Sequence, residues 1–295
     1  MLNPEKSLND RLTDRLARNS ILAKLGETWQ PVMLGLRDAG GPPVKYVLNG
    51  TFLGHALHPV LTDIPIGAWT VTAVLDAVEL AGSDVALASD ATLGLGLLGS
   101  VAAVATGYAD WADTKDEPRT LGMGHALANG IAVAGYVVSL LLRRADRRGA
   151  GIAVAYLSYA VATFAAYLGG ELMANYQLGT KHTAEPLDPP DGFTRVATLD
   201  AIEDGGMSAA GVNGIALLLF RRGQTVFAIS GACTHRGGPL REGTLEGDAC
   251  VRCPWHGSVF SLEDGAVIEG PASFPQARFE TRVVDGSVEV RAPVR

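Results

Sequence analysis

The chain has 295 residues, enough for about two domains, and 47% of them are hydrophobic while 19% are charged. Soluble domains average about 25% charged residues, so this composition predicts that part of the chain lies in a membrane. The net charge of −7 argues against nucleic acid as a partner. Residues 1–20 are charged and polar, and we therefore expect no secretory signal peptide.

Residues 1–48 form a mixed N-terminal segment. Apolar residues recur in it at near-helical spacing among charges, at Leu12, Leu16, Ile21 and Leu25. This pattern predicts one or two amphipathic helices, lying either on the membrane or on the protein's own surface. A helical face that is simply solvated is an equally good interpretation.

Four apolar segments follow, at Ile64–Gly82, Ala91–Ala109, Thr120–Leu142 and Gly149–Gly170. About 20 apolar residues match the hydrocarbon thickness of a bilayer, and three of these segments reach that length with no Asp, Glu, Lys or Arg. Asp76 and Glu79 interrupt the first segment, and we expect them to face the bundle interior or the interface. A fully buried soluble bundle is the alternative. We predict a four-helix transmembrane domain over residues 49–172.

Three sequence blocks resemble a known family of bacterial membrane proteins: Gly50-Thr51-Phe52-Leu53-Gly54-His55-Ala56-Leu57-His58-Pro59, Leu61-Thr62-Asp63-Ile64-Pro65-Ile66-Gly67-Ala68-Trp69-Thr70 and Gly169-Gly170-Glu171-Leu172. That family is domain of unknown function 2231. The resemblance implies a four-helix membrane fold but brings no established activity with it.

Five ionisable residues lie near predicted helix ends, and an up-down bundle would place them on one side: His55, His58, Asp63, Asp110 and His125. One hypothesis is a site for haem b, a metal or a quinone head group, with His58 and His125 on facing helices. The alternative is that these side chains anchor or cap helix ends where the chain enters lipid.

Residues 173–191 hold Pro186, Pro189 and Pro190 among polar residues and are predicted to form a linker, in which His182 is solvated and inert. Short alternating apolar stretches follow in residues 192–295, with the hairpin signals Asp264-Gly265 and Asp285-Gly286 between them. This pattern predicts a small antiparallel β-sandwich. The expected fold class is therefore α+β and multidomain, a transmembrane helix bundle followed by the sandwich.

Two short motifs carry the chemistry, Cys233-Thr234-His235 and Cys253-Pro254-Trp255-His256, with 17 residues between them. Thiolate and imidazole ligands both suit iron, and two of each are what a Rieske [2Fe–2S] centre needs. The flanking sequence also resembles a Rieske ferredoxin-type domain over residues 192–295, through Cys233-Thr234-His235-Arg236-Gly237-Gly238-Pro239-Leu240, Cys253-Pro254-Trp255-His256-Gly257-Ser258 and the proline loop Gly270-Pro271-Ala272.

Tetrahedral zinc is the rival for these four ligands. Zinc sites usually pair like ligands, whereas each motif here carries one Cys and one His. Cys250 creates a C-x-x-C with Cys253, which keeps zinc open, although a small buried strand residue is the simpler interpretation of Cys250.

The resemblance implies that Cys233 and Cys253 hold one iron and that His235 and His256 hold the other, with the imidazole edges as the exit for the electron. It also places Ser258, Phe260 and Pro271 around the cluster. The high-potential members of the family have a disulfide at the positions of Gly238 and Trp255 and a Tyr at that of Phe260. A low to intermediate potential is therefore expected.

Together these features predict a membrane-anchored one-electron transfer protein, with a redox partner protein or quinone and the lipid bilayer as its partners. The alternatives are a membrane oxidoreductase, in which the cluster exchanges electrons with a haem or quinone in the bundle, and a non-enzymatic redox sensor. No histidine follows His256, so we expect no second iron domain of the 2-His-1-carboxylate type and no oxygenase activity of this chain by itself. We expect a bacterial inner-membrane protein with the Rieske domain in the cytoplasm, because the three cysteines leave no structural disulfide once two bind iron.

Overall fold

The computed structural model describes residues 8–182 and 190–294 and divides the chain into two compact units. The first joins the chain up to Ala39 with Leu57–Leu178, and the second joins Gly40–Ala56 with the chain from Gly179 onward. The predicted boundary at residue 49 is therefore displaced. Residues 49–56 pack with the second unit because Thr51 and Asn49 form hydrogen bonds to its backbone and side chains.

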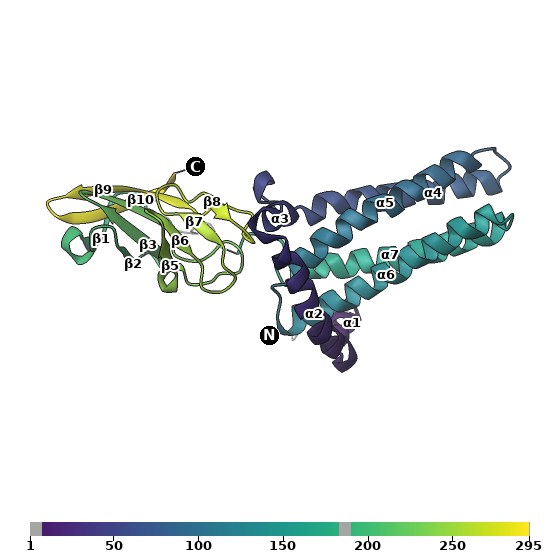
Figure 1. Cartoon of the computed structure of the whole chain (residues 1–295), viewed down its shortest axis with the longest axis horizontal. Helices are drawn as coiled ribbons and strands as arrows, with labels where there is room; N and C mark the ends of the chain where they lie inside the picture. The colour runs from purple at the N-terminus through teal and green to yellow at the C-terminus, as the bar shows by residue number, and fades with distance from the viewer. Residues whose placement is uncertain (1–7, 183–189, 295) are drawn as a thin grey trace, which may run out of the picture. The chain divides into compact units, whose positions relative to one another are not determined.

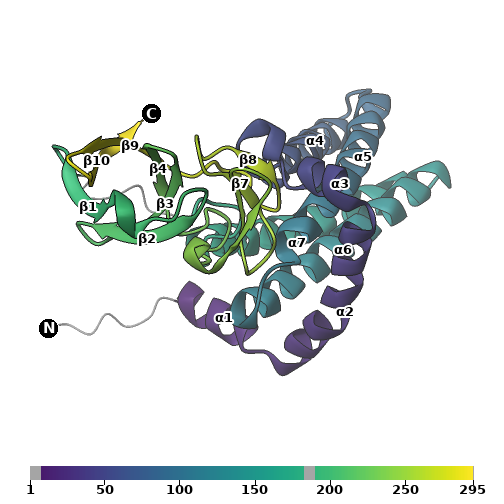
Figure 2. The ribbon, with the colours of Figure 1, turned by 60° about the vertical axis from the view of Figure 1, so that its left-hand side comes forward.

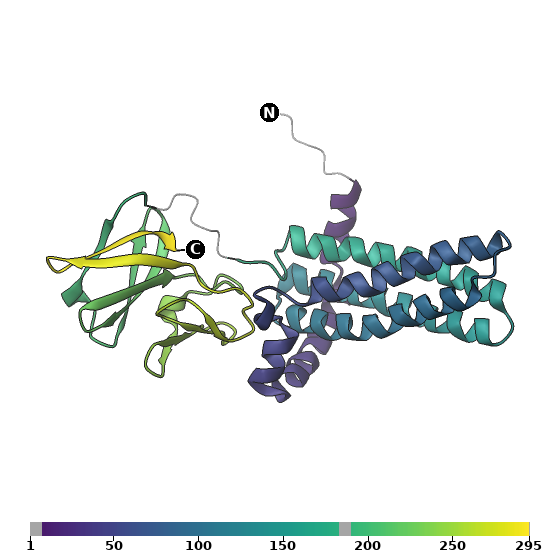
Figure 3. The same cartoon turned by 90° about the horizontal axis from the view of Figure 1, so that it is seen from above.

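The first unit is helical: α1 Leu8–Ala17, α2 Ser20–Ala39, α4 His58–Leu80, α5 Ala86–Trp111, α6 Asp116–Arg144 and α7 Arg148–Ala174 (Figure 1). Helices α4–α7 are each long and apolar enough to cross a membrane, which confirms the four predicted spans. They lie side by side as two helical hairpins, α4 with α5 and α6 with α7 (Figure 3). Helices suit this environment because each satisfies its own backbone hydrogen bonds.

The two hairpins are related to each other as an internal repeat. Residues that are 67 positions apart on α4 and α6 meet as pairs: His58 with His125, Trp69 with Tyr136, and Asp76 with Arg143. The Trp69 and Tyr136 rings stack with centroids 4.2 Å apart. The repeat places equivalent residues across a pseudo-two-fold axis that runs along the bundle.

At one end of the axis lies a buried ion pair. Arg143 Nη2 lies 2.5 Å from Asp76 Oδ2, and both side chains are fully buried. Arg148 pairs with Glu79 and Asp90 beside it. Asp76 and Glu79 thus face their partners on α6 and α7, as predicted from the sequence.

The N-terminal helices pack on the bundle with one face and expose an apolar face. Ala17 joins a buried cluster with Leu121, Leu168 and Leu172. Gln30 Nε2 donates to the carbonyl of Thr114 at 2.7 Å, and so fixes α2 to the α5–α6 connection. The outer face of α2 exposes four large apolar residues, Ile21, Trp29, Val32 and Leu36. The predicted amphipathic helices are therefore present over residues 8–39, while residues 1–7 lie outside the described part of the chain.

In its described residues, the second unit contains α3 Gly41–Leu48 and ten strands: β1 Thr194–Thr198, β2 Met207–Val212, β3 Ile215–Arg222, β4 Thr225–Ser230, β5 Thr244–Glu246, β6 Cys250–Arg252, β7 Val259–Ser261, β8 Val267–Glu269, β9 Arg278–Val284 and β10 Ser287–Val294. They form a six-stranded sheet in the order β1-β10-β9-β4-β3-β2 (Figure 2) and a four-stranded sheet in the order β5-β6-β7-β8, whose strands are labelled in Figure 1. All the pairings are antiparallel, and both predicted hairpin turns connect paired strands.

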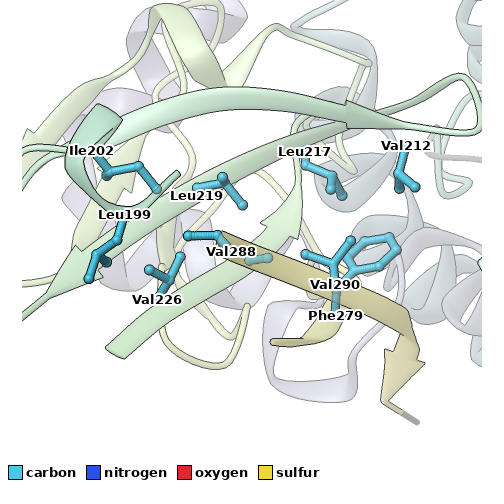
Figure 4. Packing of buried hydrophobic residues seen from close by; sticks show 10 residues of the cluster. Leu199, Ile202, Val212, Leu217, Leu219, Val226, Phe279, Val288 and Val290 are labelled. Carbon is cyan, nitrogen blue, oxygen red and sulfur yellow. The ribbon is translucent and has the colours of Figure 1, made fainter. Parts of the chain in front are cut away.

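The second unit has two apolar cores, and the large sheet contributes to both. Alternating residues of the large sheet, among them Leu217, Leu219 and Val288, form one buried cluster (Figure 4). A second cluster joins Phe220 and Ile229 of the large sheet with Phe260, Cys233 and Cys253, so the two cysteines are part of a core to which both sheets contribute. This core fixes the position of the two loops that bear the candidate ligands.

Candidate metal centre

The two motif-bearing loops follow β4 and β6 and have the same backbone construction. The N–H of Cys233 donates to the carbonyl of Gly238, and the N–H of Cys253 donates to that of Ser258, both at 2.8 Å. In each loop a glycine N–H donates back to the cysteine carbonyl, and these glycines, Gly237 and Gly257, have φ values of +72° and +78°. Glycine suits such left-handed positions because it has no Cβ to clash with the backbone.

This construction brings the four candidate ligands together with the sulfurs inside and the imidazoles outside. Cys233 and Cys253 are buried, with 1% and 3% exposure. His235 and His256 are half-buried, and their ring centroids lie 5.0 Å apart. Gly238 lies so close to the site that an added Cβ would be 2.9 Å from the Cys253 sulfur.

Backbone amides converge on each sulfur. The N–H groups of His235 and Arg236 point at Cys233, and those of Trp255 and His256 point at Cys253. The pKa of Cys253 falls to about 6, chiefly because its sulfur accepts a hydrogen bond from the Cys233 thiol, and the same bond raises the pKa of Cys233. At Cys253 the site therefore stabilises thiolate, the form of cysteine that binds iron.

The loop after β8 closes the site through hydrogen bonds to both motif loops. The Thr234 hydroxyl donates to the carbonyl of Phe274 at 2.6 Å. The N–H of Ala272 donates to Ser258 Oγ at 2.9 Å, and both residues are fully buried. Pro271 precedes this contact and follows a cis peptide bond. Ser258 thus contacts the loop that contains Pro271, and Phe260 packs in the same core as both cysteines.

Three features of this site were missed by the sequence analysis. Arg252 braces the second loop, where its Nη1 donates to the carbonyl of Gly257 at 2.7 Å and its other nitrogens pair with Glu246 and Glu269. Thr51 Oγ1 donates to the carbonyl of Ala272 at 3.0 Å. Thr51 and Ala272 are far apart in the sequence, and Arg252 and its partners form no recognisable motif. The spacing of residues therefore does not indicate these contacts.

The third feature corrects an expectation. His182, expected to be solvated, is half-buried, and its N–H donates to the carbonyl of Thr234 at 3.0 Å. The end of the predicted linker therefore packs against the first motif loop. Residues 183–189, with Pro186 and Pro189, lie outside the described residues.

The donor set fits a [2Fe–2S] cluster better than zinc. The described residues contain no group of three or more His, Cys, Asp or Glu side chains arranged around one ion. Two sulfurs and two imidazoles in separate pairs match two irons with two protein ligands each. Cys250 lies in strand β6, where burial raises the pKa of its thiol, and this favours its interpretation as a strand residue.

The candidate residues of the bundle are only partly brought together. His58 and His125 lie on α4 and α6 with ring centroids 6.4 Å apart, close enough to share a ligand. Asp110 is buried near the end of α5, whereas the Asp63 side chain is exposed. His55 is exposed in the second unit, where its Nδ1 contacts the carbonyl of Ala56. The structure therefore supports a pair of histidines rather than a five-residue site.

Comparisons with known proteins agree with both units. Residues 192–280 match the Rieske [2Fe-2S] domain, and residues 54–182 match the predicted membrane protein family DUF2231. The ferredoxin CarAc of Metapseudomonas resinovorans is 38% identical over 74 residues, which cover 25% of this chain and 68% of that protein. The anthranilate 1,2-dioxygenase ferredoxin subunit of Burkholderia cepacia is 35% identical over 105 residues, covering 36% and 88%.

A solved structure, the ferredoxin of carbazole 1,9a-dioxygenase from Nocardioides aromaticivorans IC177, is 29% identical with a TM-score of 0.33, and it covers 35% of this chain and 99% of that one. The fold and the loops define an electron-transfer domain with a [2Fe–2S] cofactor. The chain belongs to the Rieske [2Fe–2S] family, fused to a DUF2231 membrane domain.

Proposed function

We propose that this protein is a membrane-anchored one-electron carrier, in which Cys233 and Cys253 hold one iron and His235 and His256 hold the other. The observation that carries the proposal is the arrangement of the ligands, with buried sulfurs and half-exposed imidazoles. When bound, the cluster accepts and releases one electron at a time. The exposed histidine edges give that electron a short path to a partner.

The partner is proposed to be a redox protein or a quinone. Relatives of the Rieske unit are named as ferredoxin subunits of dioxygenases, which supports a protein partner that draws single electrons. Trp255 is 56% exposed beside His256 and would form an apolar contact for that partner. Phe260 has no hydroxyl to donate to a cluster sulfur, and Gly238 and Trp255 cannot form a disulfide. Both features support a low to intermediate potential.

The orientation proposed for a bacterial inner membrane places α1, α2 and the α5–α6 connection in the cytoplasm, with the Rieske domain. Their contacts support this, because Gln30 and the Arg119–Glu27 pair hold α2, which carries Lys24 and Arg37, next to the span ends. Cytoplasmic loops near span ends carry an excess of Lys and Arg. On the other side, Arg143 and Arg148 are held in ion pairs with the bundle's own carboxylates.

Metal analysis and paramagnetic resonance of the purified full chain test the main proposal. We expect equimolar iron and sulfide, and a reduced-state signal with the low average g value of a mixed His/Cys-ligated cluster. His235→Ala or His256→Ala should abolish this signal while the helices stay inserted. His182→Ala is the matched control, since it removes a histidine near the first motif loop but keeps the backbone N–H that donates to the carbonyl of Thr234. Stoichiometric zinc without iron in an anaerobic preparation would contradict the proposal.

A second candidate function is a membrane oxidoreductase, in which the bundle itself holds a redox group. The His58–His125 pair favours it, because two half-buried imidazoles face each other inside the bundle. Ionisable groups within membrane spans are costly and are usually functional.

A further inference from the structure

We propose that the bundle binds an iron tetrapyrrole between His58 and His125, with each imidazole as an axial ligand through its Nε2 atom. The inference deepens the second candidate function by naming the group that the bundle would hold. It does not depend on the Rieske cluster, and each of the two can be measured without the other.

The hydrogen bonds of the two rings fix their protonation. His58 Nδ1 lies 2.8 Å from the carbonyl oxygen of Ala103, and His125 Nδ1 lies 2.8 Å from that of Ala165. A carbonyl oxygen only accepts, so Nδ1 carries a proton in both rings, and in the neutral form of each ring Nε2 then carries the lone pair. Metal-ligating histidines are oriented in this way, with the distal N–H given to a carbonyl.

The same protonation argues against a quinone as the occupant. The carbonyl oxygens of an oxidised quinone need hydrogen-bond donors, and the neutral rings of His58 and His125 offer acceptors at Nε2. A metal ion needs these lone pairs.

The separation of the rings matches two axial ligands on one metal. A metal–imidazole bond is about 2 Å long and the ring nitrogen lies about 1 Å from its centroid, so opposed ligands place their centroids about 6 Å apart. The observed distance between the His58 and His125 centroids is 6.4 Å. The planes are nearly perpendicular at 88°, and axial ligation permits this because each ring rotates about its own bond.

The number of ligands selects a tetrapyrrole over a bare ion. A structural or catalytic zinc takes three or four protein ligands. In the parts of the chain that the structure describes, no three His, Cys, Asp or Glu side chains are grouped in this way, so the bundle offers one ion only these two imidazoles. An iron that already has four equatorial nitrogens needs only those two.

The helical repeat makes the two ligands equivalent. Each histidine ring packs against a glycine of its own hairpin, Gly107 on α5 and Gly169 on α7, four residues beyond the accepting alanine. An added Cβ would come within 2.8 Å of the His58 ring and 3.0 Å of the His125 ring. A metal on the pseudo-two-fold axis would therefore meet a histidine backed by a glycine from each side.

Asn129 packs against the His125 ring without occupying its ligand atom. Its Nδ2 lies 3.1 Å from Nε2 and 3.5 Å from Nδ1, so it lies over the ring rather than along the Nε2 lone pair. Asn129 also donates to the carbonyl of His125 at 3.0 Å, so its amide has a partner without Nε2.

The test uses the full chain, expressed with a haem precursor, purified in detergent and also titrated with haemin. We expect Soret and α bands of a six-coordinate low-spin haem, with one haem per chain in the pyridine assay. His58→Ala and His125→Ala should each lose these bands while the Rieske resonance signal persists. His55→Ala is the matched control and should keep both signals.

Chemical rescue distinguishes a variant that has lost only the axial ligand from one that fails to fold. His58→Gly should regain the six-coordinate spectrum when imidazole is added, because the free ligand fills the vacated position. A normal Rieske signal without haem bands after haemin titration would overturn this inference and leave the electron-carrier proposal intact. Haem bands that survive in both alanine variants would also overturn it.

Discussion

The immediate surroundings of the two ligand sulfurs are set by single residues, and Gly238 is the most constrained of them. An added Cβ would lie 2.9 Å from Cys253 Sγ and 3.2 Å from the Trp255 ring, closer than packed atoms tolerate. Gly238→Ala should therefore lower the iron content and destabilise the second unit by about 1–3 kcal/mol.

The neighbouring Gly237→Ala is the control for this prediction. Gly237 has a positive φ but open space around its Cβ position, so alanine there adds backbone strain of about 1–2 kcal/mol without touching the sulfur. Iron per chain and thermal bleaching of the cluster absorbance measure both variants. Equal iron content in the two would show that the contact with Cys253 is not limiting.

The variants Ser258→Ala and Phe260→Tyr are predicted to shift the midpoint potential of the cluster in opposite directions. Ser258 Oγ accepts a hydrogen bond from the Ala272 N–H, which leaves its own hydrogen available to donate to a cluster sulfur. Ser258→Ala should then lower the midpoint potential, and Phe260→Tyr should raise it if the new phenol reaches a sulfur. Redox titration of the Rieske signal measures both. No shift in either variant would show that neither side chain reaches the sulfurs.

Among the secondary-structure elements, the helices of the bundle are coupled by the buried Asp76–Arg143 pair. Removing one partner leaves an uncompensated buried charge, which typically costs about 3–5 kcal/mol. Arg143→Leu should lower the unfolding temperature in detergent strongly, and the double variant Asp76→Leu/Arg143→Leu should recover part of the loss. Arg144→Leu is the control, because Arg144 is exposed on the same turn. A double variant less stable than Arg143→Leu would contradict this account.

The elements, the two strand hairpins and the facing positions of His58 and His125 could be predicted from the sequence, whereas the other contacts between helices could not. Helices α4–α7 follow from apolar length, and the ligand loops follow from the spacing of Cys233, His235, Cys253 and His256. The pairing of Asp76 with Arg143 depends on how two helices pack, which periodicity does not specify. The repeat that relates His58 to His125 was also missed, because the two hairpins share few residue types beyond those in contact.

For the whole molecule, the proposed topology predicts which connections are accessible from outside the cell. Ser83 is exposed between α4 and α5, and Lys115 is exposed between α5 and α6. In a Cys250→Ser background, Ser83→Cys should react with an impermeant maleimide in intact cells, and Lys115→Cys should react only after lysis. The opposite pattern would reverse the orientation and place the Rieske domain outside the cytoplasm.

The second unit also joins parts of the chain that are more than 200 residues apart, and this association should contribute to the stability of the cluster. Thr51 Oγ1 donates to the carbonyl of Ala272, whose N–H in turn donates to Ser258 beside the cluster loop. The Ser273 hydroxyl donates to the carbonyl of Asn49 at 2.6 Å. Residues 49–51, which lie far before the Rieske sequence in the chain, thus form hydrogen bonds to the proline loop.

Thr51→Val keeps the shape of the side chain but removes the donor to a buried carbonyl, a loss of about 1–3 kcal/mol. Thr51→Ser keeps the hydroxyl and serves as the matched control. For a unit of this size such a loss corresponds to a decrease of several degrees in the midpoint temperature of cluster bleaching. We therefore expect Thr51→Val to bleach at a lower temperature than Thr51→Ser. If the two variants bleach at the same temperature, the segment before the first span does not support the cluster, and the Rieske domain is stabilised by its own residues alone.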